Sequence, residues 1–575
     1  MNRSETIAGL KGRNGPAVLV IGGGINGISV FRELALQGVD VLLADKGDYC
    51  SGASAALSRM VHGGLRYLEN GEFKLVRESL LERDRLLKNA PHFVAPLPTT
   101  VPIFDLFSGI TNGAFRFLGL TRRPSRRGAV VIKAGLAVYD VLTASRRLMP
   151  KHIFRSRAET LKTWPAINPD IRNSATYYDA WVSRPERLGV EMLNDALVAN
   201  PSAAALNHAQ VSGDADGVML TDTLTGETMR LKPQLIVNAT GGWIDLTNAG
   251  LGTSVPRMMG GTKGSHLIVA NRELHDALSG HMIYYENEDG RICILFPYLG
   301  NVLVGSTDIR VDDPDEVRCE ADERDYILQS LAFVFPHLRI APEEVVFQFA
   351  GVRPLPVSDD SFTGRIPRDH FCEAVPASGA LPEMLCMIGG KWTTFRSFGA
   401  LAADKALERL GMKRARDTEE LAIGGGRDFP ADVERWLIEQ AAISGLPRAR
   451  IRELFERYGT DAATIAEALG DDTMLPGCRY SIAELAHLIV HEHVEKLDDL
   501  LLRRTTIGVT GKLSSGLIEQ ALDILAGTKG WDEQRSARER QEFLALLESR
   551  HGLDGTKLSA RSERSAQCAS ALKSA

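Results

Sequence analysis

Long apolar segments and an excess of positive charge are both missing from this sequence of 575 residues. No run of about eighteen apolar residues occurs, so we expect no membrane-spanning helix. Residues 1–16 contain no apolar signal core, so we expect no export. The formal net charge of −6 at pH 7 argues against a general nucleic-acid-binding protein, because such proteins are usually basic.

Paired cysteines are missing as well. The seven cysteines lie far apart, their number is odd, and none forms a C-x-x-C pair. This predicts reduced thiols in a cytoplasmic protein. His491 and His493 are spaced i, i+2 on a predicted helix and therefore point to different faces. Since no cysteine or carboxylate spacing completes a ligand set, we predict no metal site.

The composition is that of a globular protein, with 44% apolar and 24% charged residues, and the length predicts two or three domains. Strand-like segments bounded by turn residues lie at 234–238, 265–270, 292–296, 302–304, 345–349 and 384–388. Helical spacing dominates after about residue 415, at 430–444, 448–457, 461–469, 482–492 and 517–525. The last segment, 553–575, is rich in Ser, Ala and Lys, and we predict that it is disordered.

The most informative pattern is a glycine-rich turn between an apolar strand and a helix. Val18–Ile21 leads into Gly22, Gly24 and Gly27, which have the G-x-G-x-x-G spacing. A second strand, 39–44, ends at Asp45, where an acid that hydrogen-bonds an adenosine ribose is expected. The glycines let backbone N–H groups approach a pyrophosphate at the helix N-terminus. The pattern predicts dinucleotide binding.

Several further motifs carry a family resemblance. They are the run from Ser58 to Glu69 (SRMVHGGLRYLE), Val237–Gly241 (VNATG), Lys263–His266 (KGSH), Gly305–Asp308 (GSTD), Gly351–Leu355 (GVRPL), Gly389–Thr394 (GGKWTT), His491-Glu492, and Asp498-Asp499 through Thr505. In this order they resemble the FAD-dependent, aerobic, quinone-linked glycerol-3-phosphate dehydrogenases. The resemblance covers about residues 17–550.

The resemblance implies an α/β fold. A Rossmann-like FAD-binding domain (17–100, 186–262 and 350–412) is interleaved with a mixed-sheet substrate and membrane-facing domain (101–185 and 263–349). An N-terminal extension (1–16) precedes them, and a C-terminal all-α cap domain (415–552) comes before the tail. The cofactor is expected to be FAD. Its predicted contacts are Gly22, Gly24, Asn26, Gly27, Asp45, Ser54, Ser58, His62, Gly63, Gly64, Thr240, Gly241, Gly390, Lys391, Trp392, Thr393 and Thr394.

The same resemblance implies a catalytic site for a small phosphorylated polyol, formed by His62, Arg66, Tyr67, Arg353, Arg368 and Lys391. Family similarity places cations around the phosphate and hydroxyls, at Arg66, Arg353, Arg368 and Lys391. Lys391 follows two glycines, but Leu385 and Trp392 stand where a Walker loop needs Gly and Ser or Thr, so the chain is not an NTPase. His62 is the candidate general base, because a neutral imidazole accepts a proton near neutral pH. The alternative is that His62 only orients Tyr67 or the flavin.

The segment 101–139 interleaves phenylalanines with a basic patch and contains a single acid, Asp105. Such a segment suits an anionic bilayer surface, although a core-packed loop with solvated arginines is the alternative. The resemblance favours membrane contact, because reduced FAD in this family passes electrons to a bilayer quinone. We therefore expect a cytoplasmic protein that associates peripherally with the inner face of the cytoplasmic membrane. A homodimer is left open.

Two departures from the family pattern bear on the substrate. Residues 52–57 are poorer in hydroxyls than the family's Ser/Thr-rich run. After Trp181, two acids are replaced and the loop gains a residue, in the run Val182-Ser183-Arg184-Pro185-Glu186-Arg187-Leu188. The main hypothesis is oxidation of sn-glycerol 3-phosphate to dihydroxyacetone phosphate, and the runner-up is a longer polyol phosphate such as erythritol phosphate. An amine or amino-acid oxidase and a non-enzymatic flavin sensor are the alternatives from other classes.

Overall fold

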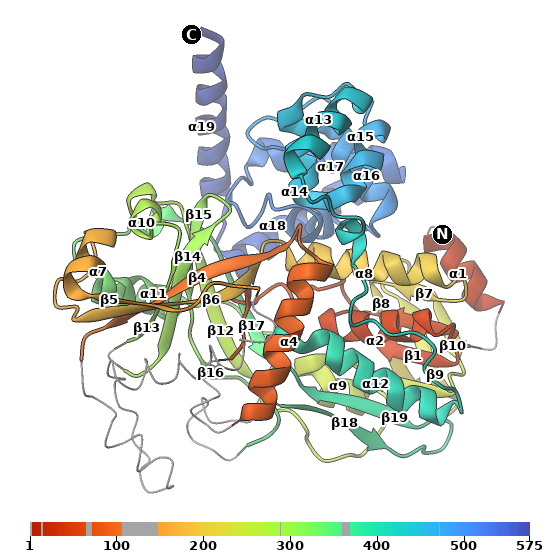
Figure 1. Cartoon of the computed structure of the whole chain (residues 1–575). Coiled ribbons are helices and arrows are strands. Elements are labelled where there is room, and N and C mark those ends of the chain that lie inside the picture. The colour runs from red at the N-terminus through yellow and green to blue at the C-terminus, as the bar shows by residue number, and fades with distance from the viewer. Residues whose placement is uncertain are drawn as a thin grey trace, which may run out of the picture.

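A computed structural model describes residues 3–12, 15–64, 72–105, 148–287, 289–358, 369–470 and 472–574. Two β-sheets stand side by side, and the C-terminal helices α13–α18 cover one end of both (Figure 1). The helix α1 (Arg3–Lys11) lies at the outer edge of the first sheet, beside β7.

The first sheet has the strand order β18-β19-β11-β1-β2-β7. These strands are β1 (Val18–Ile21), β2 (Val41–Ala44), β7 (Ala204–Leu206), β11 (Leu235–Asn238), β18 (His370–Val375) and β19 (Met384–Gly389). All neighbours pair in parallel except the antiparallel edge strand β18. The alternate residues Val18, Val20 and Leu43 pack against the helices α2 (Ile25–Leu36), α8 (Pro185–Ala199) and α12 (Phe395–Arg409).

The opposite face of this sheet is also covered, which explains why its central strands are apolar throughout. Leu19, Ile21 and Leu42 point there and pack under α9 (Ile244–Gly250) and a small antiparallel sheet. That sheet consists of β8 (Ala209–Asp214), β9 (Gly217–Asp222) and β10 (Thr228–Leu231).

The second sheet is larger and mostly antiparallel, with the order β16-β12-β15-β14-β13-β4-β6-β3, while β17 pairs with β12 and β5 with β6. Its strands are β3 (Met60–Val61), β4 (Val94–Ile103), β5 (Ile153–Ser156), β6 (Asn173–Val182), β12 (Thr262–Val269), β13 (Met282–Glu286), β14 (Ile292–Tyr298), β15 (Asn301–Gly305), β16 (Ile309–Arg310) and β17 (Val345–Arg353). In the described part of the chain, this sheet is packed against α4 (Phe73–Asn89), α7 (Arg157–Thr163), α10 (Arg272–Ala277) and α11 (Ala321–Val334), besides the C-terminal helices.

The C-terminal helices are α13 (Val433–Ser444), α14 (Arg448–Tyr458), α15 (Ala462–Ala468), α16 (Ile482–His491), α17 (Ser515–Lys529), α18 (Glu533–His551) and α19 (Gly555–Ser574). The helix α16 begins where the Ser481 hydroxyl accepts a hydrogen bond from the Glu484 N–H, a normal N-cap. Apolar side chains of α14–α18 share one core with Phe347 and Phe349 of β17. The helical domain is therefore packed directly on the second sheet.

This architecture confirms the predicted α/β fold class with a C-terminal helical domain. The strand pairing divides the chain differently from the predicted bounds at two places. The strands β3 and β4 belong to the second sheet although 17–100 was assigned to the FAD-binding domain, and the end of β17 pairs with β12 in that sheet although 350–412 was assigned there too. The prediction that residues 553–575 are disordered was wrong for the start of this segment. The helix α19 covers it, Leu558 is 1% exposed, and the Arg561 guanidinium donates to the Val346 carbonyl at 2.8 Å. Figure 1 shows the rest of α19 projecting from the body.

No helix in the described part of the chain is both long enough and apolar enough to cross a bilayer. Most of the segment 101–139, from residue 106 onward, lies outside the described residues.

Candidate active site

The glycine-rich turn lies at the carboxyl end of β1, in the middle of the first sheet. Gly22 has φ +102°, a backbone conformation that favours glycine. A Cβ at Gly27 would lie 1.8 Å from the Gly22 carbonyl oxygen, so only glycine fits there. The helix α2 then starts at Ile25 and points its N-terminus at the turn. This is the strand, turn and helix that a bound pyrophosphate requires.

Asp45 follows β2 and lies beside this turn, as the spacing predicts. Its carboxylate accepts hydrogen bonds from the Gly23 N–H at 2.6 Å and the Gly47 N–H at 2.8 Å. Burial raises the pKa of this carboxyl even though both backbone bonds oppose the shift. Ser54 is buried, and its hydroxyl accepts a hydrogen bond from the Ile25 N–H at 2.9 Å. The Ser54 side chain therefore lies against the N-terminus of α2.

The carboxyl ends of β11 and β19 reach the same edge. Gly241 follows β11 and has φ +61°, while Thr240 donates to the Asn238 side chain at 2.7 Å. Gly390 follows β19, and a Cβ there would lie 3.2 Å from Asn26 Nδ2. The predicted cofactor residues of three distant segments therefore converge on one edge of the sheet.

Three buried polar atoms at this edge have no hydrogen-bond partner among the described residues: Asn26 Oδ1, Tyr49 Oη and Trp392 Nε1. Buried polar groups are normally paired, so these atoms fit a polar ligand at the edge. Thr393 and Thr394 are buried in the short helix η5 (Trp392–Thr394) beside them. The residues present thus fit a bound flavin dinucleotide.

Lys391 is half-buried rather than at the surface. Its ammonium group donates to the Ser79 hydroxyl at 3.2 Å, and Ser79 lies on α4 (Phe73–Asn89). The lysine therefore points from the edge of the first sheet toward α4.

Arg353 ends β17, in the second sheet. Its guanidinium donates to Asp308 at 2.9 Å, to the Ser306 hydroxyl at 3.2 Å and to the Thr307 carbonyl at 3.0 Å. A Cβ at Gly264 would lie 2.2 Å from the same guanidinium, so this glycine makes room for it. The matched runs at 263–266, 305–308 and 351–355 thus form one cluster.

This cluster adjoins the edge of the first sheet that holds the glycine-rich turn and the other predicted FAD contacts, called the flavin edge below. A Cβ at Gly241 would lie 3.8 Å from Pro354, which follows Arg353. A Cβ at Gly351 would lie 2.5 Å from the Ala56 methyl group, in the segment between Ser54 and Ser58. The end of β17 is therefore packed against the turn after β11 and against the segment that leads into β3.

His266 lies in this cluster and was not predicted as a site residue. It is 3% exposed, and neither ring nitrogen has a hydrogen-bond partner among the described residues. Burial, together with the charges of Arg353 and Arg59, lowers the pKa of His266 to about 3. The imidazole is therefore neutral at physiological pH. The signal available was the KGSH run that ends at His266.

His62 is half-buried directly after β3. The next residue, Gly63, donates its N–H to the Asp179 carboxylate at 2.8 Å, and Arg83 binds the same oxygen at 3.2 Å. Gly64 has φ +81°, so the chain turns sharply here. Ser58 is half-buried one residue before Arg59, which pairs with Glu186 at 2.8 Å. Arg66, Tyr67 and Arg368 lie outside the described residues.

The run after Trp181 is not a loop throughout, because α8 begins at Pro185. Arg184 donates to the Glu456 carbonyl at 2.7 Å, and Arg187 forms a buried pair with Glu492 at 2.7 Å. Both arginines therefore contact the C-terminal domain.

The two histidines at and just after the end of α16, His491 and His493, point in different directions, as their spacing predicts. The His491 ring lies 4.5 Å from the His487 ring, whereas the His493 ring meets the Tyr49 ring edge-on at 5.7 Å.

Comparison with known proteins agrees with this geometry. Residues 17–395 match the model of the FAD dependent oxidoreductase family, and residues 416–536 match the C-terminal domain of alpha-glycerophosphate oxidase. A glycerol-3-phosphate dehydrogenase of Synechocystis sp. is 32% identical and covers 92% of this chain and 96% of its own length. This chain belongs to the FAD-dependent glycerol-3-phosphate dehydrogenase family. It is therefore an FAD-dependent oxidoreductase, and the alternative hypothesis of a non-enzymatic flavin sensor is no longer needed.

Two further members or neighbours of the family are informative. A D-erythritol 1-phosphate dehydrogenase of Brucella abortus is 29% identical, covering 85% of this chain and 93% of its own. The crystal structure of a glycerol-3-phosphate dehydrogenase from Bacillus halodurans, complexed with FAD, has the same fold, with a TM-score of 0.74 at 22% identity over 95% of this chain and 97% of that one.

Proposed function

We propose that the protein oxidises sn-glycerol 3-phosphate to dihydroxyacetone phosphate and delivers the electrons to a membrane quinone. When bound, FAD supplies the hydride acceptor, flavin N5. The chain's own residues have to hold the phosphate, place the reacting carbon and take up the hydroxyl proton. The observation that carries the proposal is the Arg353 cluster, in which a fixed guanidinium stands next to a neutral, buried imidazole at the flavin edge.

Arg353 is suited to the phosphate. Its bonds to Asp308 and to the Thr307 carbonyl hold the planar guanidinium in one orientation before a substrate arrives. Such preorganisation lowers the entropy lost on binding an anion. Lys391 approaches from the first sheet and would supply a second positive charge. Arg66 and Arg368 lie outside the described residues, and their contact with the phosphate remains a prediction.

Two histidines are candidates for the proton. His62 remains the predicted base, since Gly63 and Asp179 fix the backbone beside it. The structure adds His266, whose neutral ring has one unprotonated nitrogen that can accept a proton, although its lowered pKa makes it a weak base. Replacing each in turn with Asn separates the roles: loss of the base should lower kcat strongly and alter its pH profile, whereas loss of an orienting residue should mainly raise KM.

A longer polyol phosphate such as erythritol phosphate is the second candidate. The Brucella relative carries that activity in its name at an identity close to that of the glycerol-3-phosphate dehydrogenase from Synechocystis. A dye-reduction screen across phosphates of three- to five-carbon polyols tests both. A preference for sn-glycerol 3-phosphate supports the first proposal, and a preference for a longer chain the second. Peroxide formation from amino acids instead would indicate an amine or amino-acid oxidase.

Membrane association and the quinone are part of the proposal. We place the protein in the cytoplasm, peripherally bound to the inner face of the cytoplasmic membrane through the 101–139 segment. The segment's phenylalanines would enter the lipid surface while its arginines and Lys133 contact anionic head groups.

A further inference from the structure

A buried cluster of charges joins the C-terminal domain to the first sheet at the segment next to Asp45. Its centre is Asp48, which is 1% exposed. One carboxylate oxygen accepts from Arg503 at 2.5 Å and Arg504 at 2.7 Å, and the other accepts from Arg504 at 2.7 Å and Asn207 at 2.9 Å. The two arginines lie at the end of η8 (Asp499–Arg504), and Arg504 is 456 residues from Asp48 in sequence.

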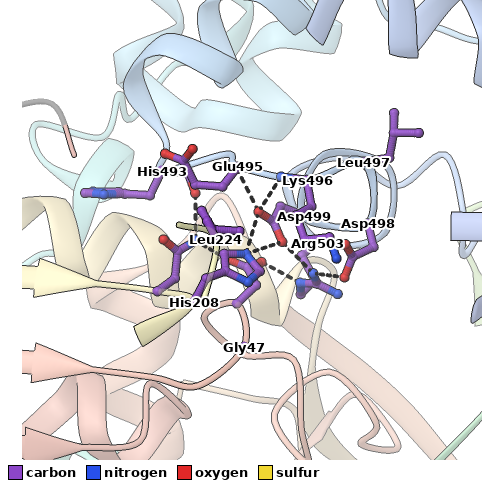
Figure 2. Close-up of polar contacts among 12 residues, drawn as sticks. Gly47, His208, Leu224, His493, Glu495, Lys496, Leu497, Asp498, Asp499 and Arg503 are labelled. Atoms are coloured by element: carbon purple, nitrogen blue, oxygen red, sulfur yellow. Dashed lines mark hydrogen bonds and ion pairs between the residues drawn. The ribbon is translucent and has the colours of Figure 1, made fainter. Parts of the chain in front are cut away.

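A second contact reinforces the first. His208, in the turn after β7, lies 3.0 Å from the Asp499 carboxylate, and Arg503 binds Asp499 at 2.9 Å. Figure 2 shows His208 above Gly47, facing Asp499 and Arg503 of the C-terminal helices. The His208 N–H also donates to the Gly47 carbonyl at 2.7 Å. The charged cluster thus contacts the segment 45–50 at two residues, Gly47 and Asp48.

The other side of this segment holds the glycine-rich turn. Asp45 accepts from the Gly23 N–H at 2.6 Å, and the Cys50 N–H donates to the Gly23 carbonyl at 2.9 Å. A Cβ at Gly23 would lie 2.7 Å from the Tyr49 ring. Gly23 is therefore held on both sides of its peptide by residues that flank Asp48.

We infer that Asp48 is a positioning residue for the cofactor: Arg503 and Arg504 hold it, so docking of the C-terminal domain sets the position of the 45–50 segment and of Gly23. The inference rests on the proposed placement of FAD at Gly22–Gly27 and Asp45. Docking of the domain and binding of FAD are then coupled, and each must strengthen the other by the same factor.

The charge pattern explains why the contact acts as a unit. Asp48 and Arg504 are both fully buried, so an unpaired partner would remain in a medium of low polarity. Separating the domain from the segment would break these pairs together and expose the groups to water, so the contact is made or lost as a whole. We therefore expect docking of the C-terminal domain to hold the segment in position.

The test compares two variants of the full-length protein. Asp48→Asn removes the charge that both arginines grip, while Glu492→Gln breaks the buried pair with Arg187 between the same two domains but outside the 45–50 segment. The FAD dissociation constant is measured by titrating the apoprotein and following flavin fluorescence. We expect roughly a 5- to 150-fold rise in Asp48→Asn, the usual range of coupling between sites. Glu492→Gln leaves Asp48 bound by Arg503 and Arg504, so it should raise this constant by a clearly smaller factor, and KM for the polyol phosphate at saturating FAD should be unchanged in both.

The unmodified protein supplies a second measurement, which does not depend on a variant that folds. FAD should slow amide hydrogen exchange in residues 493–504, because binding opposes release of the domain. The inference is overturned if FAD leaves that exchange unchanged, if Asp48→Asn binds FAD like the parent, or if Glu492→Gln weakens FAD binding equally. Unchanged FAD binding in Gly24→Val would instead refute the placement of the cofactor.

Discussion

The position of Arg353 is testable without removing any charge, through Gly264→Ala. The new methyl group would lie 2.2 Å from one guanidinium nitrogen and 2.5 Å from the guanidinium carbon. Both atoms belong to the far end of a flexible side chain, so we expect the protein to fold and the guanidinium to move. The bonds from Arg353 to Asp308, Ser306 and Thr307 would then be disturbed.

The expected effect follows from the loss of an aligned, charge-assisted hydrogen bond to the substrate phosphate. Such a bond contributes about 1.5–3 kcal/mol, which corresponds to a loss of roughly tenfold to a hundredfold in kcat/KM. The change should fall mainly on KM, and FAD content should stay near normal. Arg353→Ala and Lys391→Ala should show the same pattern.

Dye reduction with a series of polyol phosphates is the assay, and Gly250→Ala is the matched control. No atom lies within 4 Å of a Cβ at Gly250, so this variant should behave like the parent. If Gly264→Ala and Arg353→Ala both retain parental kinetics, Arg353 does not contact the substrate.

Three other predictions concern the cofactor, the membrane and pH. Acid precipitation should release a yellow, non-covalently held FAD into the supernatant, and Gly24→Val should abolish its binding; colour that stays in the pellet would mean covalent attachment. Gln at the four arginines Arg122, Arg123, Arg126 and Arg127 should reduce salt-sensitive binding to anionic vesicles and quinone reduction but spare dye reduction. Although burial lowers the pKa of His208, Asp499 and Asp48 raise it above its ordinary value. The stability from protonated His208 is therefore full below about pH 6.5 and is lost as the pH rises through its folded pKa. His208→Gln should flatten this dependence of thermal unfolding, and a parental pH profile in that variant would contradict it.

Elements with a local signal were predictable from the sequence. The strand at 18–21, the glycine turn and the second strand agree with the structure because apolar runs and glycine spacing are read within about thirty residues. The C-terminal helices α13–α17 were also predicted, since their apolar spacing is helical, whereas α18 was not predicted as a separate helix. The ladder of β4 and β6 was not. Pro96, Pro98 and Pro102 weaken the strand signal of β4, and its partner lies far along the chain.

The site divides in the same way. The glycines and Asp45 beside the turn were found from spacing, whereas the KGSH run marked His266 only as part of a family motif, and its burial beside Arg353 is what makes it a candidate site residue. The Asp48–Arg504 contact spans 456 residues, and no short-range rule pairs two charges so far apart. The start of α19 was missed because Leu558 is a single apolar anchor in a polar segment.

Anaerobic reduction of the bound flavin tests the central claim most directly. The purified holoprotein is mixed with sn-glycerol 3-phosphate, with a longer polyol phosphate, or with glycerol, and the visible flavin absorbance is followed. We predict rapid bleaching by sn-glycerol 3-phosphate and very slow bleaching by glycerol, because glycerol lacks the phosphate through which Arg353 and Lys391 bind and place the substrate. Equal bleaching by glycerol, or no bleaching by any phosphate of a three- to five-carbon polyol, would contradict the account.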